Sequence, residues 1–152
     1  MMQYPTTHYR LQKRQTELIR GLLHKGEQKA FSVIEDEENM VYLLRKGFLR
    51  HKCNLFVALD GDQAMAMYQN HKDDIGVVLL DIGLPKYSGW DIVLRIKTQN
   101  PAIKIFVTSG YLEPDIKSKM ERAGVEAFIQ KPYNAGDVVE MLCNSLEESV
   151  QR

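Results

Sequence analysis

Short apolar runs alternate with longer segments of helical periodicity from residue 30 onward. Five of the runs are rich in β-branched and aromatic residues and predict strands, at 30–35, 54–59, 75–80, 103–108 and 126–130. The run IGVVLL at 75–80 has no polar side chain, which is typical of a strand covered on both faces. Apolar stripes at helical spacing predict five helices, at 38–51, 62–70, 88–98, 113–123 and 135–148. This alternation predicts an α/β fold, a doubly wound five-stranded parallel sheet with helices on both faces.

The first 29 residues do not continue this repeat. Their apolar residues fall on one flank of a basic segment and predict an extra N-terminal amphipathic helix at about 8–24, followed by the linker HKGEQK. Residues 1–30 carry six Lys/Arg and two Asp/Glu, whereas residues 31–152 carry 14 and 18. We therefore expect a basic helix and linker at 1–29 and a domain at 30–150. The helix is interpreted as docking on the domain or pairing with a second copy; a membrane surface or an acidic partner is the alternative.

Composition excludes several classes of protein. The chain has 152 residues, 44% hydrophobic and 26% charged, with 20 basic and 20 acidic side chains, as expected for one globular domain. Zero net charge argues against nucleic acid as the main partner. No run approaches the roughly 20 apolar residues of a transmembrane helix, and no signal peptide is evident, so we expect a cytoplasmic protein. Cys53 and Cys143 lie 90 positions apart without a metal-binding spacing and are expected to be buried fillers.

Reactive side chains follow four of the five predicted strands. The first strand ends at Glu35 and Asp36, the third at Asp81, the fourth at Ser109 and the fifth at Lys131. In open parallel sheets, sites form beyond the carboxyl ends of the strands, where the strand order reverses. If the first and third strands are central neighbours and the second lies at the edge, these side chains converge on one crevice.

Three carboxylates in one crevice would repel one another, and one lysine cannot offset them. Either a carboxyl group stays protonated or a cation joins the cluster. Oxygen ligands without histidine or thiolate favour Mg²⁺ or Mn²⁺. A metal, a carboxylate, a hydroxyl and an ammonium group suit phosphoryl transfer, in which a carboxylate can itself be the acceptor. Each residue alone has a simpler explanation, such as a helix cap, a turn or a surface lysine, so the prediction depends on their joint occurrence.

Four segments resemble the response-regulator receiver domain of two-component signalling, in the order and spacing of that family. They are VIEDEE at 33–38, VVLLDIGLPKYSGW at 77–90, FVTSGY at 106–111 and AFIQKPY at 127–133. The resemblance covers about residues 30–148. It implies a flavodoxin-like fold with strand order 2-1-3-4-5 and a cis peptide bond between Lys131 and Pro132.

The resemblance also implies the roles of the acidic residues. Asp81 matches the aspartate that accepts the phosphoryl group and also binds the metal. Asp36 matches the directly metal-binding acid, and Glu35 its neighbour, which acts through water. The backbone carbonyl of Gly83 matches a further metal ligand. The acidic pair is Glu-Asp where Asp-Asp is commoner in the family.

The remaining motif residues match positions that complete and report the reaction. Lys131 matches the invariant lysine. Ser109 matches the hydroxyl residue that contacts the phosphoryl group, and strand alternation turns its neighbour Thr108 to the other side of the sheet. Gly110 matches the small residue that leaves room for the phosphoryl group. Ser109 and Phe128 match the two switch positions.

The function implied is that of a phosphorelay receiver. It accepts a phosphoryl group on Asp81 with Mg²⁺ from a histidine kinase or a histidine phosphotransfer protein, and signals through a change of shape. It catalyses its own phosphorylation and dephosphorylation but is not otherwise an enzyme. No nucleotide-binding loop, kinase segment or DNA-reading helix is evident, so the phosphoryl group is expected from elsewhere, either a partner's phosphohistidine or a small phosphodonor. A homodimer through the fourth helix, fifth strand and fifth helix of the domain, or through the N-terminal helix, is also considered.

Two other classes of protein are left open. A receiver-like interaction module that is never phosphorylated would share the fold but usually lacks one of the acids or the lysine. A magnesium-dependent phosphatase with an aspartate nucleophile would share the chemistry but needs a second acid two residues after the nucleophile, where this chain has Gly83. The choice between a free-standing regulator and a receiver module of a hybrid sensor kinase is also left open.

Overall fold

The fold is a five-stranded sheet with helices on both faces. The computed structural model of the chain describes residues 29–150, so the predicted helix at 8–24 lies outside the described residues. The strands are β1 (Ala30–Ile34), β2 (Leu55–Ala58), β3 (Ile75–Asp81), β4 (Lys104–Ser109) and β5 (Ala127–Gln130). All neighbours in the sheet pair in parallel, in the order β2-β1-β3-β4-β5. The predicted fold class and strand order are confirmed.

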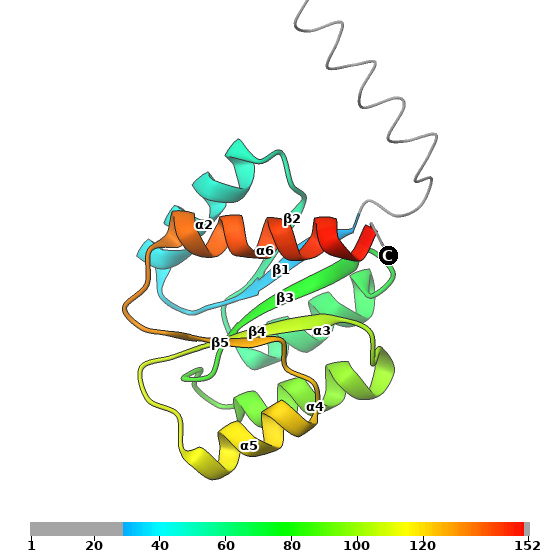
Figure 1. The fold of residues 1–152 in the computed structure, drawn as a ribbon, viewed down its shortest axis with the longest axis vertical. Coiled ribbons are helices and arrows are strands. Elements are labelled where there is room, and N and C mark those ends of the chain that lie inside the picture. Colours follow the sequence, from blue (N-terminus) through cyan, green and yellow to red (C-terminus); the bar gives the residue numbers. More distant parts are fainter. Residues whose placement is uncertain (1–28, 151–152) are drawn as a thin grey trace, which may run out of the picture.

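Between residues 29 and 150, five helices connect and follow the strands. They are α2 (Glu38–Arg50), α3 (Gly61–His71), α4 (Gly89–Gln99), α5 (Pro114–Arg122) and α6 (Ala135–Val150). Helices α2 and α6 cover one face of the sheet, and α3, α4 and α5 cover the other (Figure 1). Within residues 29–150, no helix combines the length and the apolar character needed to cross a membrane.

Two apolar clusters, one on each face of the sheet, form the core. Val78 and Leu80 of β3 belong to the cluster beneath α3, α4 and α5, whereas Val77 and Leu79 belong to the cluster beneath α2 and α6. All four side chains are at most 2% exposed. Alternate residues of a strand point to opposite faces, so a central strand with a helical layer on each side must be apolar at every position. This requirement explains the uninterrupted apolar run that marks β3 in the sequence.

The register of the sheet brings the strand ends together. Ile34 of β1 pairs with Leu80 of β3, and Leu80 pairs with Val107 of β4. The residues that follow Ile34 and Leu80 are Glu35 and Asp81, so these two acids leave adjacent strands at the same level. β1 and β3 are central neighbours and β2 lies at the edge, which is the arrangement that a shared crevice requires.

The chain turns sharply after β5. The peptide bond between Lys131 and Pro132 is cis, as the family resemblance implies. Lys131 donates a backbone hydrogen bond to the carbonyl of Ser109 at 2.8 Å, which ties the turn to the end of β4.

Candidate functional site

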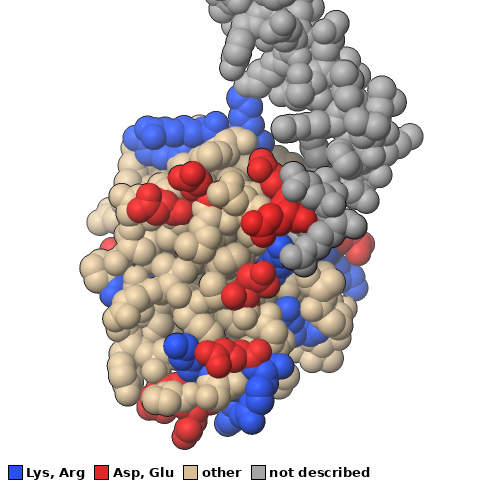
Figure 2. Space-filling view, viewed as in Figure 1, with Lys and Arg blue, Asp and Glu red and all other residues tan. Residues whose placement is uncertain are grey.

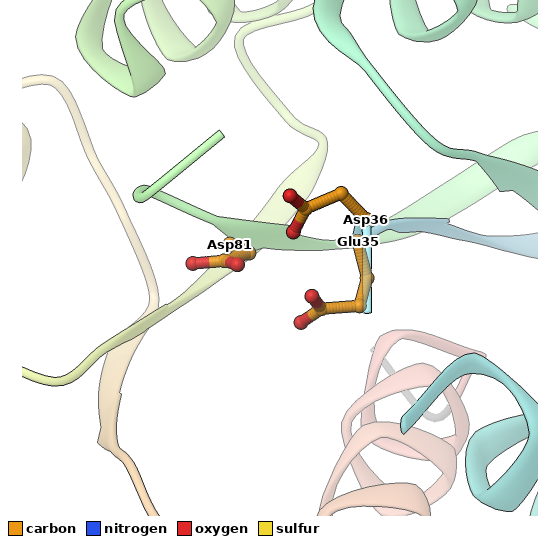
Figure 3. A group of neighbouring side chains, drawn as sticks. All are labelled: Glu35, Asp36 and Asp81. Atoms are coloured by element: carbon orange, nitrogen blue, oxygen red, sulfur yellow. The ribbon is translucent and has the colours of Figure 1, made fainter. Parts of the chain in front are cut away.

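Three carboxyl groups meet at the carboxyl ends of β1 and β3. One oxygen from each of Glu35, Asp36 and Asp81 lies within 4.8 Å of the other two (Figure 3). Glu35 and Asp81 are 2% and 5% exposed, whereas Asp36 is exposed. The site therefore has two acids in the protein interior and one that opens it to solvent.

Asp81 is held by two hydrogen bonds, one to each of its carboxylate oxygens. Its Oδ1 accepts the backbone N–H of Gly83 at 2.9 Å, and its Oδ2 accepts Lys131 Nζ at 2.9 Å. Helix α4 begins only at Gly89, so Asp81 does not cap a helix. Asp60, which follows β2, does cap one, because its side chain accepts the N–H of Gln63 in the first turn of α3. The simple explanation of a strand-end aspartate thus applies to Asp60 and not to Asp81.

Glu35 lies in an electrostatically unfavourable position. Its Oε1 accepts the backbone N–H of Glu37 at 3.0 Å, and its Oε2 is 3.6 Å from Lys131 Nζ. Burial, together with the carboxylate of Asp81, raises the pKa of Glu35 from 4.5 to about 7 despite these two contacts. Burial opposes the charge on Lys131, but hydrogen bonding and attraction to Asp81 and Glu35 outweigh it and raise the pKa of the lysine. A charged Lys131 therefore faces more negative charge than it can neutralise.

Ser109 lies at the end of β4, and its hydroxyl is hydrogen-bonded to the backbone. It is 9% exposed, and its Oγ donates to the backbone carbonyl of Tyr111 at 2.5 Å. Thr108 is also buried, and its hydroxyl has no hydrogen-bond partner among the residues that the structure describes. A Cβ added at Gly110 would meet no atom within 4 Å, so the space beside Ser109 is open. Gly83 lies so close to Asp81 that a Cβ there would be 3.4 Å from Asp81 Oδ1.

Phe128 lies on β5, away from the acid cluster. It pairs with Val107 of β4 and is half-buried, with its side chain packed at the margin of the cluster beneath α3, α4 and α5. Lys117 Nζ of α5 stands 5.6 Å from the centre of its ring. Phe128 therefore touches both the sheet and α5, as the switch hypothesis requires.

Tyr133 is a neighbour of the site to which sequence reasoning gave no role. Its hydroxyl is buried and has no hydrogen-bond partner within the described part of the chain. Burial and the nearby carboxylates of Glu35 and Asp81 raise its pKa. The signal in the sequence was a tyrosine two residues after Lys131, but sequence alone does not show that this side chain turns back toward the acids.

The donor set fits a hard divalent cation. All three acidic side chains that converge are carboxylates, and burial together with the charge of Asp81 raises the pKa of Glu35 even though Lys131 lies beside it. Mg²⁺ and Mn²⁺ prefer oxygen ligands and keep several of their waters. Asp36 is exposed, whereas the other two acids are buried. The site is therefore open to solvent on the side of Asp36, where a bound ion could keep its waters.

An acidic groove runs beside β5 and α6. It encloses about 540 Å³, and its lining includes four carboxylates and the side chain of Met141, which is 41% exposed. The carboxylates are those of Glu126, Asp137, Glu140 and Glu148. Acidic side chains gather over α6, whereas basic and acidic side chains mix over α5 (Figure 2). This face therefore favours a partner that presents positive charge.

Solved structures establish the fold independently. The receiver domain protein from Methanospirillum hungatei, described as CheY-like, superposes with a TM-score of 0.73 over 81% of this chain and 97% of its own, at 20% identity. The signal receiver domain of a LuxO repressor protein from Vibrio parahaemolyticus gives a TM-score of 0.72 over 81% and 93%, also at 20% identity.

Relatives in sequence support the same family. The cyclic di-GMP phosphodiesterase of Thermotoga maritima is 36% identical over 61% of this chain and 23% of its own length. The sensory transduction protein RegX3 of Mycolicibacterium smegmatis is 33% identical over 70% and 46%. The chain spans less than half the length of these relatives. Residues 31–143 match the family described as the response regulator receiver domain. The chain therefore belongs to the response regulator receiver domain family of two-component signalling.

Proposed function

We propose that this chain receives a phosphoryl group on Asp81 in a Mg²⁺-dependent reaction and passes the signal on by changing shape. The observation that carries the proposal is the position of Asp81, buried between Lys131 and two further acids and not used as a helix cap. Receiver domains take their phosphoryl group from histidine kinases or phosphotransfer proteins, and we assign this chain a donor of the same kind. The protein is then a cytoplasmic regulator and not an enzyme acting on a separate substrate.

The ion would be held by Asp36 and Asp81 directly, by the backbone carbonyl of Gly83, and by Glu35 through water. When bound, Mg²⁺ or Mn²⁺ supplies positive charge that neutralises the phosphoryl oxygens during transfer. Glu35 gives up its proton more readily beside a cation, because the raised pKa of this residue comes from burial and from the charge of Asp81.

Asp81 performs the covalent step. One carboxylate oxygen attacks phosphorus, the bond from phosphorus to the imidazole nitrogen of the donor breaks, and the electron pair leaves with the imidazole. Lys131, already 2.9 Å from Asp81 Oδ2, is placed to stabilise negative charge on the incoming group. Attack of water on the resulting acyl phosphate restores the carboxylate and releases inorganic phosphate.

Ser109 and Phe128 would report the arrival of the phosphoryl group. The hydroxyl of Ser109 must leave the carbonyl of Tyr111 to donate to a phosphoryl oxygen. Phe128 then moves into the space that the serine vacates, and its contact with Lys117 of α5 is lost or rearranged. The face formed by α5, β5 and α6 changes shape as a result, and a downstream partner or a second copy binds there. A shift of this kind needs only a few kcal/mol of differential stability between two states.

The segment 1–29 is assigned to a separate role from the domain at 30–150. Its basic character contrasts with the acidic groove along α6, and we assign it to docking on the domain or to pairing between copies. Nucleic acid is not assigned as a partner.

A phosphodonor assay tests the proposal. The full chain is incubated with acetyl phosphate and MgCl₂, and its intact mass is measured over time. We expect one added phosphoryl group, no addition in excess EDTA, and none in Asp81→Asn. Asp60→Asn is the matched control, because it changes another strand-end aspartate to a residue that also caps helices well. A chain that is never phosphorylated, or one phosphorylated equally in Asp81→Asn, contradicts the proposal.

A further inference from the structure

The two cysteines, distant in sequence, touch each other in the fold. Cys53 lies between α2 and β2, Cys143 lies on α6, and their Sγ atoms are 3.7 Å apart in a thiol–thiol hydrogen bond. Both are free thiols, and Cys143 is buried whereas Cys53 is half-exposed. The expectation that both are buried fillers is therefore wrong for Cys53.

The backbone on each side holds the thiols in place. The N–H of Cys53 donates to the carbonyl of Phe48 at 3.1 Å, and Lys52 has a φ of 56°, so the chain leaves α2 through a closed turn. Helices α2 and α6 approach so closely that a Cβ on Gly47 would be 2.8 Å from Val139 Cγ2, one turn before Cys143. The pair is thus built into the contact between two helices that pack on one face of the sheet.

We propose that Cys53 and Cys143 form a reversible disulfide with each other when the protein meets a small oxidant, either a peroxide or a low-molecular-weight disulfide. The sulfurs need to approach by less than about 2 Å to reach the S–S distance of a disulfide. With peroxide, the Cys53 thiolate attacks one oxygen and the O–O bond breaks. Cys53 becomes a sulfenic acid, and hydroxide departs as the leaving group. Cys143 then attacks that sulfur and water leaves. In total two thiols lose two electrons and two protons, and one peroxide becomes two waters.

The two thiols have different roles in this sequence. Solvent reaches Cys53 but scarcely reaches Cys143, so the oxidant meets Cys53 first. The hydrogen bond with Cys143 lowers the pKa of Cys53, whereas the same hydrogen bond and burial raise the pKa of Cys143. This asymmetry favours Cys53 as the attacking thiolate and Cys143 as the resolving thiol.

The thiol pair is separate from the acid cluster. Cys143 lies eight residues along α6 from Ala135, about 12 Å from the helix end that follows Lys131. Cys53 precedes β2, at the opposite end of the strands from Glu35 and Asp81. A disulfide here would join α6 to the α2–β2 connection without touching the proposed phosphoacceptor.

Redox titration of the full chain tests the proposal. The protein is equilibrated at two concentrations in glutathione buffers of rising disulfide content, trapped with an alkylating agent, and measured by intact mass and peptide mapping. We expect a species that has lost two hydrogens, a linked peptide that contains residues 53 and 143, and a fraction oxidised that does not depend on protein concentration. The oxidised protein should unfold at a higher urea concentration than the reduced one, because the link closes a loop of about 90 residues.

Variants separate this proposal from nonspecific oxidation. In Cys143→Ser, oxidation should stop at a sulfenic acid on Cys53 or at a mixed disulfide between Cys53 and glutathione. Cys53→Ser should leave Cys143 largely resistant to oxidant, and Cys143→Ala repeats the first test if the serine variant unfolds. Intermolecular dimers as the only disulfide product, or two unlinked thiols across the whole titration, overturn the proposal. Phosphorylation from acetyl phosphate is measured on the same samples, so that failure of the thiol chemistry is distinguished from failure of the proposed phosphoacceptor.

Discussion

Replacing Glu35 with glutamine should stabilise the metal-free protein at alkaline pH. The folded protein holds the pKa of Glu35 at about 7, against 4.5 for the ordinary group. Between these values the folded state binds a proton that the unfolded state has released, so the free energy of unfolding falls as the pH rises from about 4.5 to about 7. A pKa difference of this size corresponds to about 3 kcal/mol at full effect. Coupling to Asp81 and Lys131 reduces the expected gain to about 1–3 kcal/mol.

Urea denaturation in EDTA at pH 5 and pH 8 measures this gain. At pH 5 Glu35 is protonated in the folded protein and resembles glutamine, so the two proteins should differ little. At pH 8 Glu35→Gln should be the more stable, because the amide oxygen can still accept the N–H of Glu37 without a buried charge. Saturating Mg²⁺ at pH 8 should narrow or reverse the difference, because the ion binds the ionised site more tightly and stabilises the wild type.

Glu121→Gln is the matched control. Glu121 is exposed on α5, so its substitution removes one negative charge from the surface and should change the free energy of unfolding little. A stability difference for Glu35→Gln that is the same at pH 5 and pH 8 would refute the reasoning. So would an equal gain in Glu121→Gln, because the effect would then reflect net charge and not burial.

Three further predictions concern neighbouring residues. Asp36→Ala should lower Mg²⁺ affinity at least about tenfold while the fold is retained, and an unchanged affinity by titration calorimetry would remove Asp36 from the ligand set. Thr108→Val should raise the free energy of unfolding by up to about 1 kcal/mol, because it removes a buried hydroxyl without a partner among the described residues; a loss of stability in urea would show that the hydroxyl is in fact satisfied. Addition of beryllofluoride and Mg²⁺ should move Phe128 inward and release its contact with Lys117, and an unchanged ring in the activated structure would exclude this switch.

The fold follows from the sequence because its strongest signals come from burial. The run at 75–80 has one physical explanation in a small α/β domain, a central strand covered on both faces, and β3 has that position. Helix bounds shift by only one or two residues from the prediction. Asp60 and Asp81 look alike in the sequence, and only the distance to the next helix separates a cap from a candidate acceptor.

Side-chain pairings across the fold could not be predicted in the same way. Nothing in the spacing of Cys53 and Cys143 indicates contact, because it depends on how α6 returns across the sheet to α2. The return of Tyr133 toward the acids depends on the turn after Lys131. The role of Ser109 at the phosphoryl group stays a prediction, because the structure holds no phosphoryl group and the hydroxyl donates to the carbonyl of Tyr111, a partner that the sequence does not indicate.

β5 lies at the edge of the sheet, and this position bears on which part of the domain can move when the charge of the acid cluster changes. Among the strands that the structure describes, β5 pairs only with β4, through four registered residues, and it leads directly into Lys131. The ammonium group that contacts Asp81 therefore follows an edge strand, which has a hydrogen-bonded neighbour on one side only. β1 and β3 carry the acids from the middle of the sheet and are paired on both sides. The acids thus follow strands that are paired on both sides, whereas the lysine that faces them follows an edge strand. A change in charge can therefore be relayed through the edge of the sheet while the central strands keep their pairing.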